Sequence, residues 1–143
     1  MYAALRALPI PDDVVARLFR AASLLREHRG DGHIAALMIE GVGGLEAHVL
    51  LALDMDMPAE QFGRIHHLPA AQLIAVIDGM RDRGLIGDDG WLSEPGRAVK
   101  QRVEALTDDL AAKPYESLEP GDLDELMAAL EPLAARLLAT QDQ

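Results

Sequence analysis

Chemically active side chains are densest in one short run, Arg26-Glu27-His28-Arg29-Gly30-Asp31-Gly32-His33, with Glu46 and His48 not far beyond it. Arginine and histidine bind anions, and glycine lets a ligand approach the backbone closely. If one helix ends at Gly30 and another begins after Gly32, the free N–H groups of the second helix attract negative charge as well. The run therefore predicts a site for an acidic small molecule. The residues predicted to bind it are Arg26, His28, Arg29, His33, Glu46 and His48.

Two other interpretations of this run stay open. His28, His33 and His48 are side chains that a divalent metal accepts, but they lack the HExxH spacing or any similar helical spacing, so we predict no metal site. The run is otherwise a structural junction, in which Asp31 caps the second helix and the arginines pair with glutamate. We expect no cofactor.

A second pattern extends from Leu68 to Val103. An amphipathic helix over 69–83 ends in Arg-Gly-Leu-Ile, a hairpin turns at Asp89-Gly90, and Leu92-Ser93-Glu94-Pro95-Gly96-Arg97 opens the next helix. The sequence therefore predicts the order helix, two-stranded hairpin, helix. This order resembles the winged helix-turn-helix of MarR-like regulators, in which the long helix is the recognition helix and the hairpin is the wing. The resemblance implies double-stranded DNA as a partner and a homodimer formed by helices at the chain ends.

The face of the 69–83 helix that is expected to point outward has few groups suited to DNA. Gln72 is its one good donor and acceptor for a base edge, whereas Asp78, Asp82 and the Asp88-Asp89 tip of the wing repel phosphate. We therefore expect modest, salt-sensitive binding in which phosphate contacts dominate. The residues predicted to contact DNA are Arg64, His66, His67, Gln72, Arg81, Arg83 and Arg97.

The length, composition and charge of the chain restrict the class of protein. It has 143 residues, half of them hydrophobic, and a formal net charge of −11, which suits one folded domain. The charge is −3 over residues 1–58, zero over 59–103 and −8 over 104–143, so the predicted DNA-binding segment is neutral. Cysteine is absent, and charges interrupt every apolar run before it could cross a membrane. We expect a cytoplasmic protein that does not bind membranes.

The elements that must position these residues are mostly helices, because apolar residues recur at three and four positions. We predict a single domain over 1–143 in three parts: N-terminal helices over 12–58, the helix-turn-helix and wing over 59–103, and C-terminal helices over 104–143. Within the first part, helices are expected from Asp12 to Arg29, after Gly32, and over 45–53. A short helix over 59–66 precedes the long one. The predicted fold class is thus mainly α, a winged helix-turn-helix with flanking dimerisation helices.

The C-terminal part carries two apolar seams. Valine and leucine recur with alternating spacings of three and four over 99–110, and leucine does so over 123–137, with Pro132 in the second segment. Such seams pack against another helix. They form either an intramolecular core or a symmetric dimer interface, and the resemblance to MarR-like proteins favours the homodimer.

The Leu-Arg-Glu-His-Arg-Gly-Asp-Gly-His run, together with Glu46-Ala47-His48 and Arg83-Gly84-Leu85, also resembles an uncharacterised actinobacterial helix-turn-helix family. Its members are often about twice this length, and the chain resembles their C-terminal half, so it is either a short form or a truncated one. The Gly41–Gly44 segment lacks the Lys-Ser/Thr of a P-loop, and no nucleophile elbow occurs, so we expect no enzyme. We predict a ligand-responsive transcriptional regulator; the alternative is a winged-helix module that binds a small ligand or a protein instead of DNA.

Overall fold

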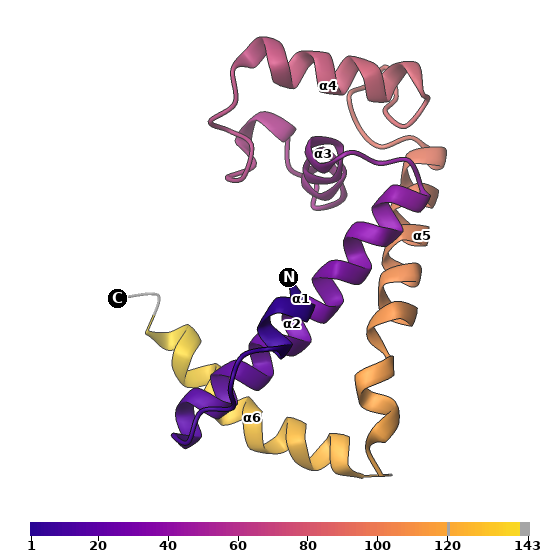
Figure 1. The fold of residues 1–143 in the computed structure, drawn as a ribbon. Helices are drawn as coiled ribbons and strands as arrows, with labels where there is room; N and C mark the ends of the chain where they lie inside the picture. The colour runs from indigo at the N-terminus through magenta and orange to yellow at the C-terminus, as the bar shows by residue number, and fades with distance from the viewer. Residues whose placement is uncertain (120, 141–143) are drawn as a thin grey trace. The chain divides into compact units, whose positions relative to one another are not determined.

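The computed structural model describes residues 1–119 and 121–140. These residues form two compact units, Met1–Ala111 and Ala112–Gln143. The first unit contains α1 (Tyr2–Arg6), α2 (Val14–Ile39), α3 (Gly44–Asp54), the 3-10 helix η1 (Ala59–Gln61), α4 (Ala70–Asp82) and α5 (Glu94–Ala111). The second contains the 3-10 helix η2 (Lys113–Ser117) and α6 (Asp122–Ala139). Figure 1 shows these elements along the chain.

The longest helix, α2, is continuous, so the predicted junction at Gly30 is wrong. Its cap is Asp13, whose carboxylate accepts a hydrogen bond from the Ala16 N–H at 2.8 Å. Neither Gly30 nor Gly32 has a positive φ, and the helix instead ends before Gly41, where φ is 65°. A Cβ on Gly32 would lie 3.1 Å from the Leu110 Cβ. That glycine therefore permits the close approach of α5 to α2 and does not stop the helix.

The core of the first unit lies where α2, α3, α4 and α5 meet. In this unit α5 packs along α2, and α3 packs against both α4 and α5 (Figure 1). The seam predicted over 99–110 contributes to this contact, because Val99 and Val103 are buried. Leu50, Ile65 and Met80 are almost fully buried in this core, so they join the segment over 59–82 to the other helices.

The predicted two-stranded wing is wrong, because the described residues contain no β-strand. Between α4 and α5 there is one isolated antiparallel bridge, Ile86 to Leu92, closed by a Gly87 N–H bond to the Trp91 carbonyl at 2.9 Å. The reason is length: α4 ends at Asp82 and α5 begins at Glu94, so once the turn is made too few residues remain for a ladder. The fold is helical with a hairpin-like loop.

The start of α5 explains why this loop is so short. The Ser93 hydroxyl accepts a hydrogen bond from the Gly96 N–H at 3.0 Å and donates to the Gly84 carbonyl. Ser93 therefore caps α5 in the manner typical of serine before a helix. A Cβ on Gly96 would lie 2.1 Å from the Leu85 carbonyl oxygen, so only glycine fits where α5 crosses the loop.

Of the other predicted elements, α3, α4 and α6 lie close to their expected bounds. The short helix predicted over 59–66 is reduced to η1, because Phe62 is already extended and Gly63 follows it. The remaining residues up to Leu68 form hydrogen-bonded turns. No single helix in the described segments is long and apolar enough to cross a membrane; only α2 and α3 taken together pass that test, and they are bent by 98°.

Candidate functional site

The segment predicted from the sequence to be the helix-turn-helix runs from η1 through the turns to α4. Buried Ile65 anchors the turns, and Leu73 and Met80 fix the inner face of α4. The outer face of α4 carries Gln72 and also Ile74, which is 56% exposed. The other exposed side chains of α4 are Ala70, Ala71, Ala75, Asp78 and Asp82. This face is therefore small, uncharged at its N-terminal end and acidic at its C-terminal end.

The basic side chains nearest the start of α4 lie in the turns before it. Arg64, His66 and His67 are all exposed. A ring nitrogen of His66, Nδ1, donates to the Gly63 carbonyl at 2.7 Å. Arg64 has no ion pair or hydrogen bond within residues 1–119 and 121–140, so its guanidinium is available to an anion.

The other three predicted arginines bind within the protein. Arg81 pairs with Asp78 at 2.6 Å, and Arg97 donates to the Leu92 carbonyl. The guanidinium of Arg83 contacts both carboxylate oxygens of Glu46 at 2.9 and 3.0 Å and donates to the Gly41 carbonyl at 2.9 Å. These contacts join α4 to the α2–α3 connection and fold the hairpin-like loop.

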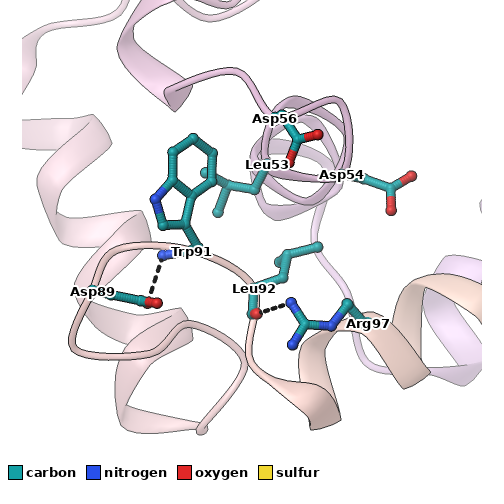
Figure 2. A pocket seen from close by; sticks show the side chains of 7 residues that line it. All are labelled: Leu53, Asp54, Asp56, Asp89, Trp91, Leu92 and Arg97. Carbon is teal, nitrogen blue, oxygen red and sulfur yellow. Dashed lines mark hydrogen bonds between the residues drawn. The ribbon is translucent and has the colours of Figure 1, made fainter.

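The loop itself borders an acidic hollow of about 400 Å³. Figure 2 shows the Trp91 ring next to Leu53, with the Asp89 carboxylate accepting a hydrogen bond from the backbone N–H of Trp91 and the Arg97 guanidinium turned to the Leu92 carbonyl. Asp54 and Asp56 complete the lining. No group of three metal-binding side chains occurs among the residues that the structure describes. This hollow would repel a phosphate.

The six residues predicted to bind an acidic ligand do not share one site. Arg26 pairs with the adjacent Glu27, and Arg29 pairs with Glu104 at 3.2 Å. His28 packs its ring 5.1 Å from that of Tyr2, and Glu46 binds Arg83. Asp31 does not cap a helix but binds the N-terminal ammonium at 3.1 Å, which lowers its pKa.

His33 and His48 do come together, at a cavity of about 260 Å³ formed by α2, α3, α5 and the turn before α4. Arg64, Lys100 and Glu104 supply the charges of this cavity. Its apolar wall is formed by Ile34, Leu37, Ala47, Leu50, Leu51 and Val103. The residues from α5 were not among those predicted, although Lys100 and Glu104 have the spacing of a helical ion pair.

Thr107 determines which nitrogen of His33 carries the proton. The Thr107 hydroxyl is fully buried and donates its one proton to the Val103 carbonyl at 2.6 Å. Its 3.0 Å contact with the Nδ1 atom of His33 therefore requires that Nδ1 donates. Burial lowers the pKa of His33, against an opposing effect of Glu104. The lowered pKa favours the neutral ring, in which the Nε2 atom is left as an acceptor.

The charges around the two histidines differ. Glu104 binds Lys100 at 2.7 Å and Arg29 at 3.2 Å, and these contacts keep the pKa of Glu104 low. Lys100 also faces Asp54 at 3.6 Å. Burial first, and then Arg64, lowers the pKa of His48. The cavity therefore has a compensated ion pair on α5 and an uncompensated positive charge next to His48.

Similarity to known proteins is found at the level of a family. No curated protein and no solved structure matches the chain. The model of a helix-turn-helix family, however, matches residues 1–143, which is the whole chain. The protein therefore belongs to that helix-turn-helix family.

Proposed function

We propose that this protein binds double-stranded DNA and acts as a transcriptional regulator. The observation that carries the proposal is the match of the whole chain to a helix-turn-helix family, because the second helix of such a unit enters the major groove of DNA. The arrangement of η1, the turns and α4 on a buried inner face agrees with that role. Gln72, which is exposed near the N-terminal end of α4, would face base edges in this proposal.

Phosphate contacts in this proposal come first from Arg64, since its guanidinium has no partner in the described residues. His66 and His67 flank it in the same turns. Arg81, Arg83 and Arg97 would contact phosphate only through donors left over from their internal bonds. Gln72 alone gives little base discrimination, so affinity depends more on salt than on sequence.

A matched pair of variants tests this proposal. Arg64→Gln removes the proposed phosphate contact, whereas Arg17→Gln removes an exposed arginine from α2, far along the chain from the turns. In fluorescence anisotropy with labelled duplex DNA, Arg64→Gln should weaken binding to all sequences alike, and Arg17→Gln should not. Equal affinities for the two variants would place the DNA surface elsewhere.

A second function has one observation in its favour. The outer face of α4 carries Asp78 and Asp82, and the neighbouring loop is acidic, so a helix-turn-helix module that binds a small ligand or a protein instead of DNA fits the same surface. Absence of duplex binding at 50 mM salt, with the protein folded, would favour this function.

The proposed regulator is a homodimer through α6. The apolar face of α6 is 36–64% exposed, and in the described part of the second unit η2 is the one other element. If two copies of α6 pair antiparallel with Leu126 opposite Leu130, the heptad positions place Asp122 opposite Arg136 at both ends. This complementarity supports self-association.

The regulator is also proposed to respond to an acidic small molecule. Of the residues that the sequence predicts for that site, His33 and His48 line the 260 Å³ cavity. Their position between α2, α3 and α5, next to the turn that leads to α4, suits a ligand that influences the DNA-binding segment.

A further inference from the structure

Arg64 belongs to two surfaces. It lies in the exposed turns before α4, where DNA would approach, and it lines the 260 Å³ cavity with His48. A single guanidinium cannot give its full charge to a phosphate and to a second anion at once. An anion in the cavity would therefore compete for the group on which the proposed DNA contact most depends.

The cavity favours a particular kind of anion. Its volume lies just below the range of about 300–1,000 Å³ typical of ligand pockets, so it suits a small molecule. Ile34, Leu37, Leu51 and Val103 offer an apolar wall, which inorganic anions cannot use. Glu104 is already held by Lys100 and Arg29, so the free positive charge is at the Arg64 end.

We infer that the cavity is an effector site for a small apolar carboxylate whose acid group binds Arg64 next to His48, and that its binding releases DNA. Carboxylate binding stands on the cavity alone, and only the release of DNA rests on the proposed DNA-binding function. Because Thr107 holds the Nδ1 atom of His33, the Nε2 atom of this lining residue would be the one to accept a hydrogen bond from a hydroxyl on the ligand. Because the coupling free energy between two binding sites is reciprocal, saturating DNA weakens binding of the carboxylate by the same factor.

The first experiment measures ligand binding to the cavity in the absence of DNA. It uses isothermal titration calorimetry and thermal shift, with phenylacetate as the probe. Phenylacetate should raise the melting temperature of the wild type, because a ligand of the native state stabilises it. Phenylacetamide, which has the same shape without the charge, should bind at least about tenfold more weakly, and so should inorganic phosphate, which lacks the apolar body. Equal shifts for phenylacetate and phenylacetamide, or none, would overturn the site.

Two variants separate the cavity from the DNA surface. Ala47→Leu adds volume inside the cavity and leaves Arg64 in place, so it should lose phenylacetate and keep DNA affinity. Arg64→Gln should lose both, and Arg17→Gln should lose neither. Circular dichroism checks that each variant is folded, and if Ala47→Leu does not fold, Leu51→Phe tests the same point from another wall.

The last arm adds phenylacetate to the protein–DNA complex. Saturating phenylacetate should weaken DNA binding about fivefold or more in the wild type and have no effect on Ala47→Leu. Unchanged wild-type DNA affinity with phenylacetate bound would refute the competition. Phenylacetate binding by a protein that binds no duplex would refute the DNA proposal and leave the ligand site standing.

Discussion

One guanidinium nitrogen of Arg83 donates to both carboxylate oxygens of Glu46, at 2.9 and 3.0 Å. Another nitrogen of the same group donates to the Gly41 carbonyl. Glu46 in turn accepts the Gly43 N–H at 2.8 Å, at the start of α3. Arg83, which the sequence predicts to contact DNA, therefore links the end of α4 to the α2–α3 connection.

The first prediction concerns the contacts of Arg83 with Glu46 and the Gly41 carbonyl. Arg83→Ala should lower the free energy of unfolding by about 1 kcal/mol, the upper part of the range for partly exposed ion pairs, because the Gly41 carbonyl loses a partner as well. Urea denaturation measures the change. Arg17→Ala serves as the control and should cost less than about 0.5 kcal/mol. Equal losses in the two variants would show that the Arg83 contacts add nothing.

The second prediction tests the continuity of α2 with two glycines. Gly30→Ala meets nothing within 4 Å and should stabilise the protein by about 0.5–1 kcal/mol, as expected inside a helix. Gly32→Ala brings a Cβ to 3.1 Å from the Leu110 Cβ, so it should destabilise the α2–α5 contact. Thermal denaturation of both variants checks this. Destabilisation by Gly30→Ala would indicate a helix end at that residue.

The third prediction is a loss of stability at mildly acidic pH. Burial lowers the pKa values of His33 and His48 in the folded protein, so below about pH 6.5, the ordinary histidine pKa, the unfolded chain binds more protons than the folded one. Stability therefore falls as the pH drops from 7.5 through 6.5 toward the lowered folded pKa values.

Urea denaturation at pH 7.5 and 5.5 measures this loss. It should be smaller in His33→Gln than in the wild type, whereas the exposed His67→Gln should behave like the wild type. The same pH dependence in His33→Gln would assign the effect to other groups.

The fourth prediction concerns association through α6. Light scattering at micromolar concentration should give the mass of a dimer. Leu126→Asp with Leu130→Asp places charges in the proposed interface and should yield a folded monomer, since the second unit is separate from the core of the first. Asp122→Arg should weaken the dimer, and adding Arg136→Asp should restore it. Monomer mass for the wild type would contradict the proposal.

The sequence predicted some parts of this molecule well for physical reasons. The period of apolar residues over 69–83 and the serine and proline after Leu92 place the ends of α4 and the start of α5 almost where they lie. These signals are local. The wing was wrong because Asp89-Gly90 signals a turn but not the length of the strands beside it, and the capping of α5 by Ser93 leaves no room for them.

The candidate site was harder to predict, because its parts are distant in the sequence. Local composition gave weight to Gly30 and Gly32 as helix breakers, whereas the packing of α5 keeps them helical. The direction in which each charged residue of α2 points depends on that continuity: Arg29 turns to Glu104, and His33 turns to Thr107. Lys100 and Glu104 line the cavity only because α5 folds back along α2.

The salt dependence of DNA affinity tests the central claim most directly. Anisotropy titrations of the wild type with labelled duplex DNA at several salt concentrations between 50 and 200 mM give the slope of log K against log salt, which is about −0.9 per phosphate contact. One Arg64 contact in each protomer of a dimer predicts a slope near −1.8, about a tenfold loss over this range, and a shallower slope for Arg64→Gln. No binding at 50 mM salt, or a slope that Arg64→Gln leaves unchanged, would contradict the proposal that this helix-turn-helix protein binds DNA through the turn before α4.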